Sequence, residues 1–368
     1  MKAKVKNVVV TVTISLFFLV GFLMCIFHEQ VEVSESERRV LARFPEFTWE
    51  EIIDGTNITE FEDYTLDQFP MRDTFRSIKA WVSLNVFKQM DNNDIYMVDG
   101  SVSKLEYPLA PNMVDYAADH WQGIYDKFIA DTDAKVYYSV VPDKNYFIAE
   151  QNGYPALDYQ AMIEQLKGKL GDMTYIDIFD CLEIEDYYKT DSHWSQEKIL
   201  EVVDRISTAM GIRDQLSFEF EQKQLGVFHG VYRGQSALPL KKEPLIYLTN
   251  AVIENATVFN LETGKTTAVY DLEKFTGSDP YDAFLSGATA HLTIENPNAV
   301  EKRELIVFRD SFGSSLTPLL IEGYSKITVL DTRYIMSGML GNVVDFDTAD
   351  DILFIYSAAI INNSTALK

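Results

Sequence analysis

Apolar residues form one unbroken block near the start of the chain and shorter, regularly spaced blocks further along. Val8 to Phe27 is a run of twenty residues without a formal charge. At about 1.5 Å rise per residue, a helix of that length crosses the roughly 30 Å hydrocarbon core of a bilayer. The block is longer than the apolar stretch of a cleavable signal peptide, and His28-Glu29-Gln30 offers no small-x-small exit. The pattern favours an uncleaved signal anchor over a cleaved one and places it within residues 1–28.

The charges around this block predict its orientation. Lys2, Lys4 and Lys6 precede it, and the positive-inside tendency keeps such an end in the cytoplasm. The polar and charged residues 29–45 suit a juxtamembrane stalk. We therefore expect a single-pass protein of the cell membrane whose remaining residues, 46–368, form an extracytoplasmic domain.

Beyond the stalk, apolar runs typical of strands alternate with helical periodicity. Lys135 to Val141 is rich in β-branched and aromatic residues and stops at a proline, as a buried strand feeding a loop does. Residues 195–211 repeat apolar positions at helical spacing between Ser195 and Gly211, which predicts a capped amphipathic helix. Such alternation predicts an α/β fold with a mostly parallel sheet. Further strands are expected at Tyr175–Phe179, Leu305–Phe308, Ile327–Leu330 and Ile352–Tyr356, and further helices at Ile58–Val86 with a break at Pro70, Ser314–Glu322 and Tyr334–Leu340.

Between about residues 215 and 300 the pattern changes to short alternating runs such as Phe218-Glu219-Phe220, separated by turn residues such as Thr263-Gly264. Alternation with period two is typical of half-buried strands. We therefore predict a β-rich insertion in the α/β domain.

Composition narrows the classes of partner. The 368 residues carry a formal net charge of -24, whereas nucleic-acid binding needs clustered Lys and Arg. The same charge repels polyanions, so neutral substrates fit best. Cys25 lies in the apolar block and Cys181 in the predicted domain, so no disulfide is expected. Phe22-Leu23-Met24 lacks the small residue of a lipoprotein site, which leaves lipidation of Cys25 as the weaker alternative.

Asp191 and His193 are the strongest candidates for chemistry, because the chain holds only five histidines. Far downstream, the run Glu304 to Gly313 is typical of a strand entering a tight turn that presents Ser311 at the start of a helix. A serine becomes a nucleophile when an imidazole accepts its proton and a carboxylate fixes the imidazole tautomer. The three residues therefore predict a Ser-His-Asp triad, with the Ser311 backbone N–H as one oxyanion donor.

Two other interpretations use the same residues. In the first, Ser311 only caps a helix, and Asp191 and His193 form a solvated loop pair. In the second, Asp191 and His193 join His229 and His291 around a divalent ion. The spacing disfavours a metal, because the sequence contains no His-x-x-x-His or Cys-x-x-Cys pair. We expect neither a metal nor a cofactor.

The segment Tyr187 to Trp194 resembles the signature of the DHHW protein family, with Ser192 in place of the first family histidine. The likeness extends to the segments Glu62–Arg72, Val141–Asn145, Phe284–Gly287 and Arg309–Gly313. This family is similar to the alginate O-acetylation proteins and to the wider SGNH hydrolase superfamily. The resemblance implies an SGNH-like α/β/α three-layer domain in which Asp191, His193 and Ser311 match the family's catalytic positions, while Arg309 stands where SGNH enzymes have glycine.

The resemblance also implies a function. It indicates an extracytoplasmic serine O-acyltransferase, in the first place an O-acetyltransferase, or an esterase acting on cell-surface or exported polysaccharide. A membrane-bound O-acyltransferase would deliver the acetyl group. The alternative is a non-catalytic envelope protein that binds glycans or an assembly partner, which the position of His193 relative to Asp191 and Ser311 discriminates. Expected substrate-binding residues are Lys144, Asn145, Trp194, Arg309 and Arg333.

Overall fold

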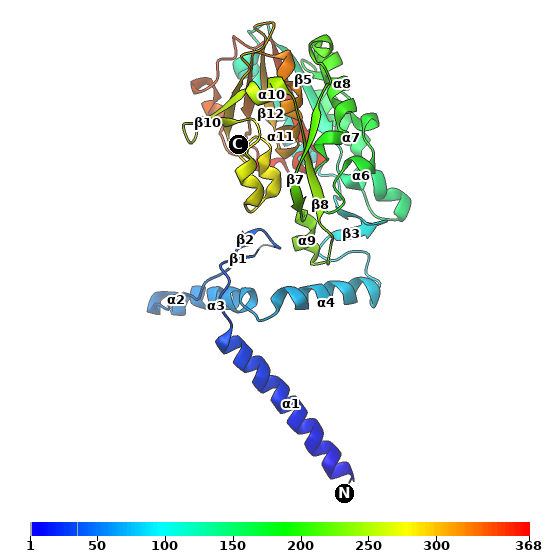
Figure 1. Ribbon diagram of the computed structural model, residues 1–368, viewed down its shortest axis with the longest axis vertical. Coiled ribbons are helices and arrows are strands. Elements are labelled where there is room, and N and C mark those ends of the chain that lie inside the picture. Colours follow the sequence, from blue (N-terminus) through cyan, green and yellow to red (C-terminus); the bar gives the residue numbers. More distant parts are fainter. Residues whose placement is uncertain (1, 35) are drawn as a thin grey trace. The chain divides into compact units, whose positions relative to one another are not determined.

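The computed structural model describes residues 2–34 and 36–368. Met1 and Glu35, which belong to the predicted anchor and the predicted stalk, lie outside the described residues. The chain forms two compact units (Figure 1). The first comprises residues up to Gln89 together with Gly234–Pro239, and the second comprises Met90–Arg233 and Leu240–Lys368.

The first unit begins with α1, a helix that spans Lys2–Phe27 and is long and apolar enough to cross a membrane as an anchor or a signal sequence does. A short antiparallel pair follows, and then three helices. The break expected at Pro70 is confirmed, because α3 ends before it and α4 begins after it. The elements are β1 (Val33–Ser34), β2 (Arg39–Val40), α2 (Trp49–Asp54), α3 (Thr56–Asp67) and α4 (Arg72–Asn85).

The second unit is built on an eight-stranded sheet of order β10-β9-β11-β13-β12-β14-β5-β6. The five strands from β13 to β6 are parallel, and β11, β9 and β10 continue the sheet in antiparallel pairing. The predicted α/β fold with a mostly parallel central sheet is confirmed. The strands are β5 (Lys135–Val141), β6 (Thr174–Tyr175), β9 (Thr257–Asn260), β10 (Lys265–Ala268), β11 (His291–Glu295), β12 (Glu304–Arg309), β13 (Lys326–Leu330) and β14 (Asp351–Ser357).

Helices cover both faces of this sheet because the central strands carry apolar side chains on both faces. In β12, Leu305 and Val307 enter one core, whereas Ile306 and Phe308 enter the other. Period two sends successive side chains to opposite faces, so both faces must be covered. The result is three layers. One core takes side chains from α8 (Leu200–Met210), α10 (Ala251–Asn255) and α11 (Ser311–Leu316), and the other from α5 (Pro111–Ile124), α7 (Tyr159–Lys169) and α12 (Ala358–Asn362).

The stretch predicted as a β-rich insertion does contain strands, but they serve two structures. β7 (Glu221–Phe228) and β8 (Glu243–Thr249) form a separate antiparallel pair, and β9 to β11 extend the central sheet. The proposed extent of the extracytoplasmic domain, 46–368, stays a prediction. The remaining strands and α-helices of the described chain are β3 (Ile95–Val98), β4 (Ser101–Lys104), α6 (Lys144–Ile148) and α9 (Val231–Ser236).

Several predicted helices are shorter than their periodicity indicates. Residues 195–211 form a 3₁₀ turn, Gln196–Lys198, before α8, and Gly211 ends α8 with φ of 72° as expected for glycine. α11 passes into a 3₁₀ helix at Thr317, where Pro318 has no N–H for an α-helical bond. The segment expected as a helix from Tyr334 is a 3₁₀ helix over Ser337–Asn342.

Candidate active site

The segment Tyr187 to Trp194 folds into a tight hairpin on the second unit. Tyr187 and Trp194 form an antiparallel bridge, and the Tyr188 N–H donates to the His193 carbonyl at 3.0 Å. Asp191 and His193 therefore both lie in the bend between the two bridged residues. This local geometry explains why a carboxylate and an imidazole two residues apart come into contact.

The structure places Asp191, His193 and Ser311 in one chain of contacts. His193 Nδ1 lies 2.7 Å from Asp191 Oδ1, and His193 Nε2 lies 2.7 Å from Ser311 Oγ. Asp191 is fully buried, and its Oδ2 accepts a hydrogen bond from the Val231 N–H at 2.8 Å. A carboxylate held in this way orients an imidazole whose other nitrogen faces a hydroxyl, which is the arrangement required of a serine, a general base and an orienting acid.

Ser311 lies at the carboxyl edge of the sheet, where β12 passes directly into α11. Asp310 fixes the turn: its Oδ1 accepts from the Phe312 N–H at 3.0 Å and its Oδ2 from the Ser357 N–H at 2.8 Å. At Gly313, a Cβ atom would lie 2.4 Å from Arg309 Cβ, so only glycine allows this close approach. The Ser311 N–H, in the first turn of α11, has no acceptor within the helix and is available to an oxyanion.

Tyr281 is a member of the site that sequence reasoning missed. Its ring stacks on the His193 imidazole, with 3.9 Å between centroids and 11° between planes. Its hydroxyl donates to Ser315 Oγ at 2.8 Å, and burial raises its pKa well above the ordinary value, so the phenol stays neutral. The ring therefore fixes the plane of the base. Tyr281 lies in a loop between β10 and β11, and no local pattern marks it.

Lys144, predicted as a substrate-binding residue, lies beneath the hairpin instead of facing a substrate. Its side chain is 1% exposed, and its ammonium donates to the carbonyls of Tyr188, Lys189 and Asp191 at 2.8, 3.0 and 3.2 Å. Burial lowers the pKa of Lys144 to about 7. These contacts tie three backbone carbonyls of the hairpin to one point, so we propose that Lys144 positions Asp191.

Glu243 holds the same hairpin from its outer side. Its carboxylate accepts from the N–H groups of Lys189 and Thr190, at 2.7 and 2.6 Å, and from the Thr190 hydroxyl at 2.6 Å. Gly230 packs so closely that a Cβ there would lie 2.0 Å from the Thr190 carbonyl oxygen. Glu243 starts β8, about fifty residues from the hairpin, and nothing near it in the sequence indicates this role.

Three other residues predicted to bind substrate are also buried. Asn145 accepts from the Tyr96 hydroxyl at 2.7 Å, and Trp194 Nε1 donates to Ser315 Oγ at 2.8 Å. Arg309 donates to the Gly287 carbonyl at 2.9 Å. All three are 1% exposed or less, so they support the walls of the site from inside.

Arg333 is the one predicted substrate-binding residue that keeps some exposure, with its side chain 18% accessible. Its guanidinium pairs with Asp331 at 2.6 and 2.9 Å. Arg309 approaches the same carboxylate at 3.5 Å. Asp331 follows β13 at the carboxyl edge of the sheet, so Arg333 lies at the edge where Ser311 lies.

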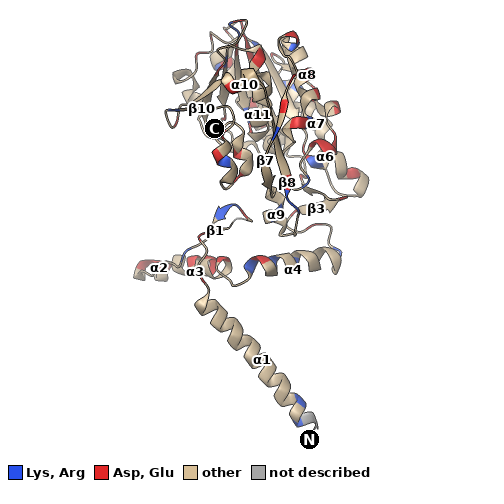
Figure 2. Ribbon diagram, viewed as in Figure 1, with Lys and Arg blue, Asp and Glu red and all other residues tan. Residues whose placement is uncertain are grey.

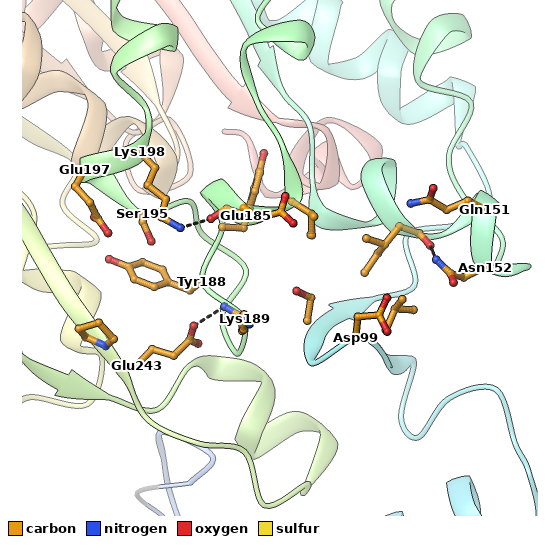
Figure 3. A pocket seen from close by; sticks show the side chains of 16 residues that line it. Asp99, Gln151, Asn152, Glu185, Tyr188, Lys189, Ser195, Glu197, Lys198 and Glu243 are labelled. Carbon is orange, nitrogen blue, oxygen red and sulfur yellow. Dashed lines mark hydrogen bonds between the residues drawn. The ribbon is translucent and has the colours of Figure 1, made fainter.

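A cavity of about 580 Å³ lies on the outer side of the hairpin (Figure 3). Tyr188, Lys189 and Ser195 of the hairpin region line it, and the side chains of Glu197 and Gln151 point toward it. Its volume lies in the range of small-molecule sites. Residues of the hairpin, and Glu243 which holds it, thus also line a cavity with both polar and apolar walls.

In the described part of the chain, no group of three or more His, Cys, Asp and Glu side chains gathers as metal ligands would. His291 lies within β11, opposite Leu330, and His229 follows β7. The structure therefore brings His193 to Ser311 and Asp191 and does not assemble the four residues considered for a divalent ion.

Removal of the Lys144 ammonium should loosen the hairpin. In Lys144→Met, three carbonyls lose their buried donor, and we expect the free energy of unfolding to fall by about 1 to 3 kcal/mol. Esterase activity should fall as well, because Asp191 loses its backbone support. Urea unfolding of the full chain in detergent measures the first effect and ester hydrolysis the second. Lys135→Met, an exposed lysine at the start of β5, serves as the control and should change neither.

The difference in unfolding free energy between wild type and Lys144→Met should also depend on pH. Because the folded pKa of Lys144 is about 7 and the ordinary value is 10.5, the unfolded chain holds an extra proton between these pH values. Stability rises with pH wherever the unfolded state binds more protons, by up to about 1.4 kcal/mol per pH unit for one group. The unfolding free energy of wild type minus that of Lys144→Met should therefore grow from pH 7 to pH 9. A difference that stays constant over this interval contradicts a lowered pKa.

Comparison with solved structures shows the fold through two proteins with a TM-score above 0.5 and finds a weaker likeness to a third. A DHHW family protein from Eubacterium siraeum aligns with a TM-score of 0.58 at 19% identity, over 76% of this chain and 97% of that one. Bacillus cereus PatB1, solved with a sulfonyl adduct, aligns with a TM-score of 0.60 at 18% identity, over 73% and 95%. The O-acetyltransferase domain of Pseudomonas putida AlgJ aligns with a TM-score of 0.45 at 11% identity, over 73% and 92%.

Sequence comparison gives the family. None of the curated proteins compared with the chain matches it significantly. The sequence model described as DHHW protein matches residues 92–330, which is more than half of the chain and includes the hairpin and Ser311. The chain belongs to the DHHW protein family.

Proposed function

We propose that this protein is a serine O-acyltransferase that moves an acetyl group to a hydroxyl of cell-surface or exported polysaccharide. The observation that carries the proposal is the contact chain Asp191–His193–Ser311, with 2.7 Å at each step from the imidazole. A non-catalytic glycan-binding protein has no need of both contacts. The two distances therefore favour an enzyme.

In the proposed reaction, His193 Nε2 accepts the Ser311 proton while Ser311 Oγ attacks the acyl carbonyl. The leaving group takes that proton from His193 as its bond to the acyl carbon breaks, which leaves an acetyl ester on Ser311. A sugar hydroxyl then gives its proton to His193 and attacks the ester. The Ser311 hydroxyl is restored when the same proton returns. Water in place of the sugar makes the protein an esterase.

Two observations support a glycan acceptor at the cell envelope. The apolar helix α1 is long enough to hold the protein at a membrane, where a membrane-bound O-acyltransferase partner would supply the acetyl group. The cavity on the outer side of the hairpin carries carboxylate, amide and hydroxyl groups, which bind sugar hydroxyls, although Ser311 and His193 do not line it. The net charge of -24 favours a neutral saccharide over a polyanion.

The fold relative PatB1 adds a chemical argument. That structure carries a sulfonyl adduct. Sulfonyl reagents are electrophiles that react with activated hydroxyls, so a reagent of this class is a direct probe of the proposed nucleophile. We expect the same reagent to modify this chain at Ser311.

The deciding experiment offers the purified full chain p-nitrophenyl acetate and then a neutral oligosaccharide. Mass spectrometry of the quenched protein should show one acetyl group on the peptide that contains Ser311, and the oligosaccharide should receive that group faster than water does. Transfer to water alone would make the protein an esterase. An unmodified peptide under conditions of ester turnover would refute the acyl-enzyme, and saccharide binding without any acetylation would leave the non-catalytic function.

A further inference from the structure

The helices α2 to α4 expose a concentration of large apolar side chains. Trp49 and Ile53 of α2 are 81% and 84% exposed, and Trp81 of α4 is 56% exposed. Soluble domains rarely leave many large apolar side chains uncovered in one region. We name these residues the apolar face of α2–α4. It consists of Trp49, Ile52, Ile53, Ile58, Phe61, Leu66, Phe69, Met71, Phe75, Ile78 and Trp81.

Polar groups around the junction of α3 and α4 are engaged within the first unit. Glu37 pairs with Arg76 at 2.9 Å, and Arg39 donates to Asp67 at 2.7 Å. Gln68 donates to the carbonyls of residues 31 and 42 at 2.9 and 3.1 Å. The segment after α1, which was predicted to be a stalk, is therefore hydrogen-bonded to these helices. It holds them through Asp67, Gln68 and Arg76, while the apolar face stays open.

The sequence of α4 also separates charged residues from large apolar residues. The residues from Arg72 to Lys79 include Arg72, Asp73, Arg76 and Lys79, whereas the rest of the helix has no charged residue, as Figure 2 shows. In an α-helix, residues three and four apart share one side. Phe75, Ile78 and Trp81 follow this spacing, so they present their rings and branches together.

The junction of α3 and α4 lies next to the end of α1. Pro70, between α3 and α4, lines a shallow apolar depression with Leu23, Met24 and Phe27 of the last turns of α1. If α1 crosses a bilayer, its end marks the boundary between hydrocarbon and water. The helices that follow are then held at the depth where head groups meet acyl chains.

We propose that the apolar face of α2–α4 lies in the head-group region of the bilayer that α1 crosses. Tryptophan and other aromatic side chains prefer this region because one part of the ring is apolar and another is polar. Helices with one apolar side lie in the interface plane and bury that side among the acyl chains. The two remaining tryptophans, Trp121 and Trp194, are fully buried in the second unit, so only Trp49 and Trp81 are available to lipid.

This assignment rests on α1 as an anchor and does not depend on the proposed catalysis. A protein with an inactive Ser311 would bind the membrane surface in the same way. Contact along three helices holds the first unit more firmly than one helix does. It also keeps the first unit flat on the membrane instead of swinging on a tether.

Tryptophan fluorescence of the full chain in liposomes tests the proposal. The protein is reconstituted into phosphatidylcholine and, in parallel, into phosphatidylcholine brominated on its acyl chains, because bromine quenches only tryptophans that contact lipid. The brominated lipid should remove up to about half of the emission, since two of the four tryptophans face lipid. In Trp49→Phe/Trp81→Phe the emission should become insensitive to bromine.

Charged substitutions separate the helices from the anchor. Phe75→Glu/Ile78→Glu should reduce the quenching while sedimentation shows that α1 still holds the protein in the liposome. Val300→Glu, at an apolar residue that is 95% exposed in the second unit, should leave it unchanged. Equal emission in the two lipids, quenching that survives in Trp49→Phe/Trp81→Phe, or undiminished quenching in Phe75→Glu/Ile78→Glu would overturn the proposal; equal emission would assign the face to a protein partner instead.

Discussion

Ser311→Ala should abolish acyl transfer and lower kcat/KM for p-nitrophenyl acetate by a factor of about 10³ to 10⁶, the range seen when the nucleophile of a Ser-His-Asp triad is removed. The reason is structural. Ser311 Oγ is the atom that faces His193 Nε2 at 2.7 Å, and β12 and α11 fix its place. Alanine leaves this backbone intact and removes only the attacking atom.

The control for this variant lies one turn further along the same helix. Ser314 is buried, and its hydroxyl has no hydrogen-bond partner among the described residues, so Ser314→Ala should keep nearly full activity. Both variants are assayed for ester hydrolysis and then treated with phenylmethanesulfonyl fluoride. Wild type and Ser314→Ala should each gain one sulfonyl group, and Ser311→Ala none. A sulfonyl group on Ser311→Ala would assign the nucleophile to another residue.

Much of the sheet could be predicted because its central strands follow a simple rule. A strand buried on both faces is a short continuous apolar run, and β5, β12, β13 and β14 all fit that description. The antiparallel strands β9 and β11 alternate instead, so they were expected to form an insertion. Their pairing with each other and with β13 joins them to the central sheet, and such long-range pairing has no local signal.

In the candidate site too, some residues could be predicted from the sequence and others could not. Asp191 and His193 are two residues apart, and Ser311 follows an obvious strand, so residue type and position were enough to single them out. Glu243 and Tyr281 touch the hairpin from elements that are distant in sequence, and neither residue type is rare in this chain. Lys144 was singled out, but a buried lysine and an exposed one look alike in a sequence. Only packing shows which carbonyls surround its ammonium.

Asp191→Asn should reduce kcat by a factor of about 10⁴, although its shape hardly changes. Val231 N–H points at one side-chain oxygen of Asp191, and His193 Nδ1 points at the other. An asparagine amide has one oxygen and one NH₂ group. If the oxygen faces Val231, the NH₂ group faces Nδ1 and makes Nδ1 an acceptor, which moves the imidazole proton to Nε2. The nitrogen that should accept the Ser311 proton is then already protonated.

Each amide orientation sets the NH₂ group against one backbone N–H in a fully buried position: that of Val231 in one orientation, and in the other that of His193, which donates to Asp191 Oδ1 at 3.2 Å. The tautomer is therefore the quantity to measure. Nitrogen NMR of labelled His193 should report the proton on Nδ1 in wild type and on Nε2 in Asp191→Asn, while Asp180→Asn, at an exposed carboxylate paired with Arg205, should match wild type in both spectrum and rate. Lost activity with an unchanged tautomer would mean that Asp191 acts by charge and packing alone. Retained activity would remove it from the triad.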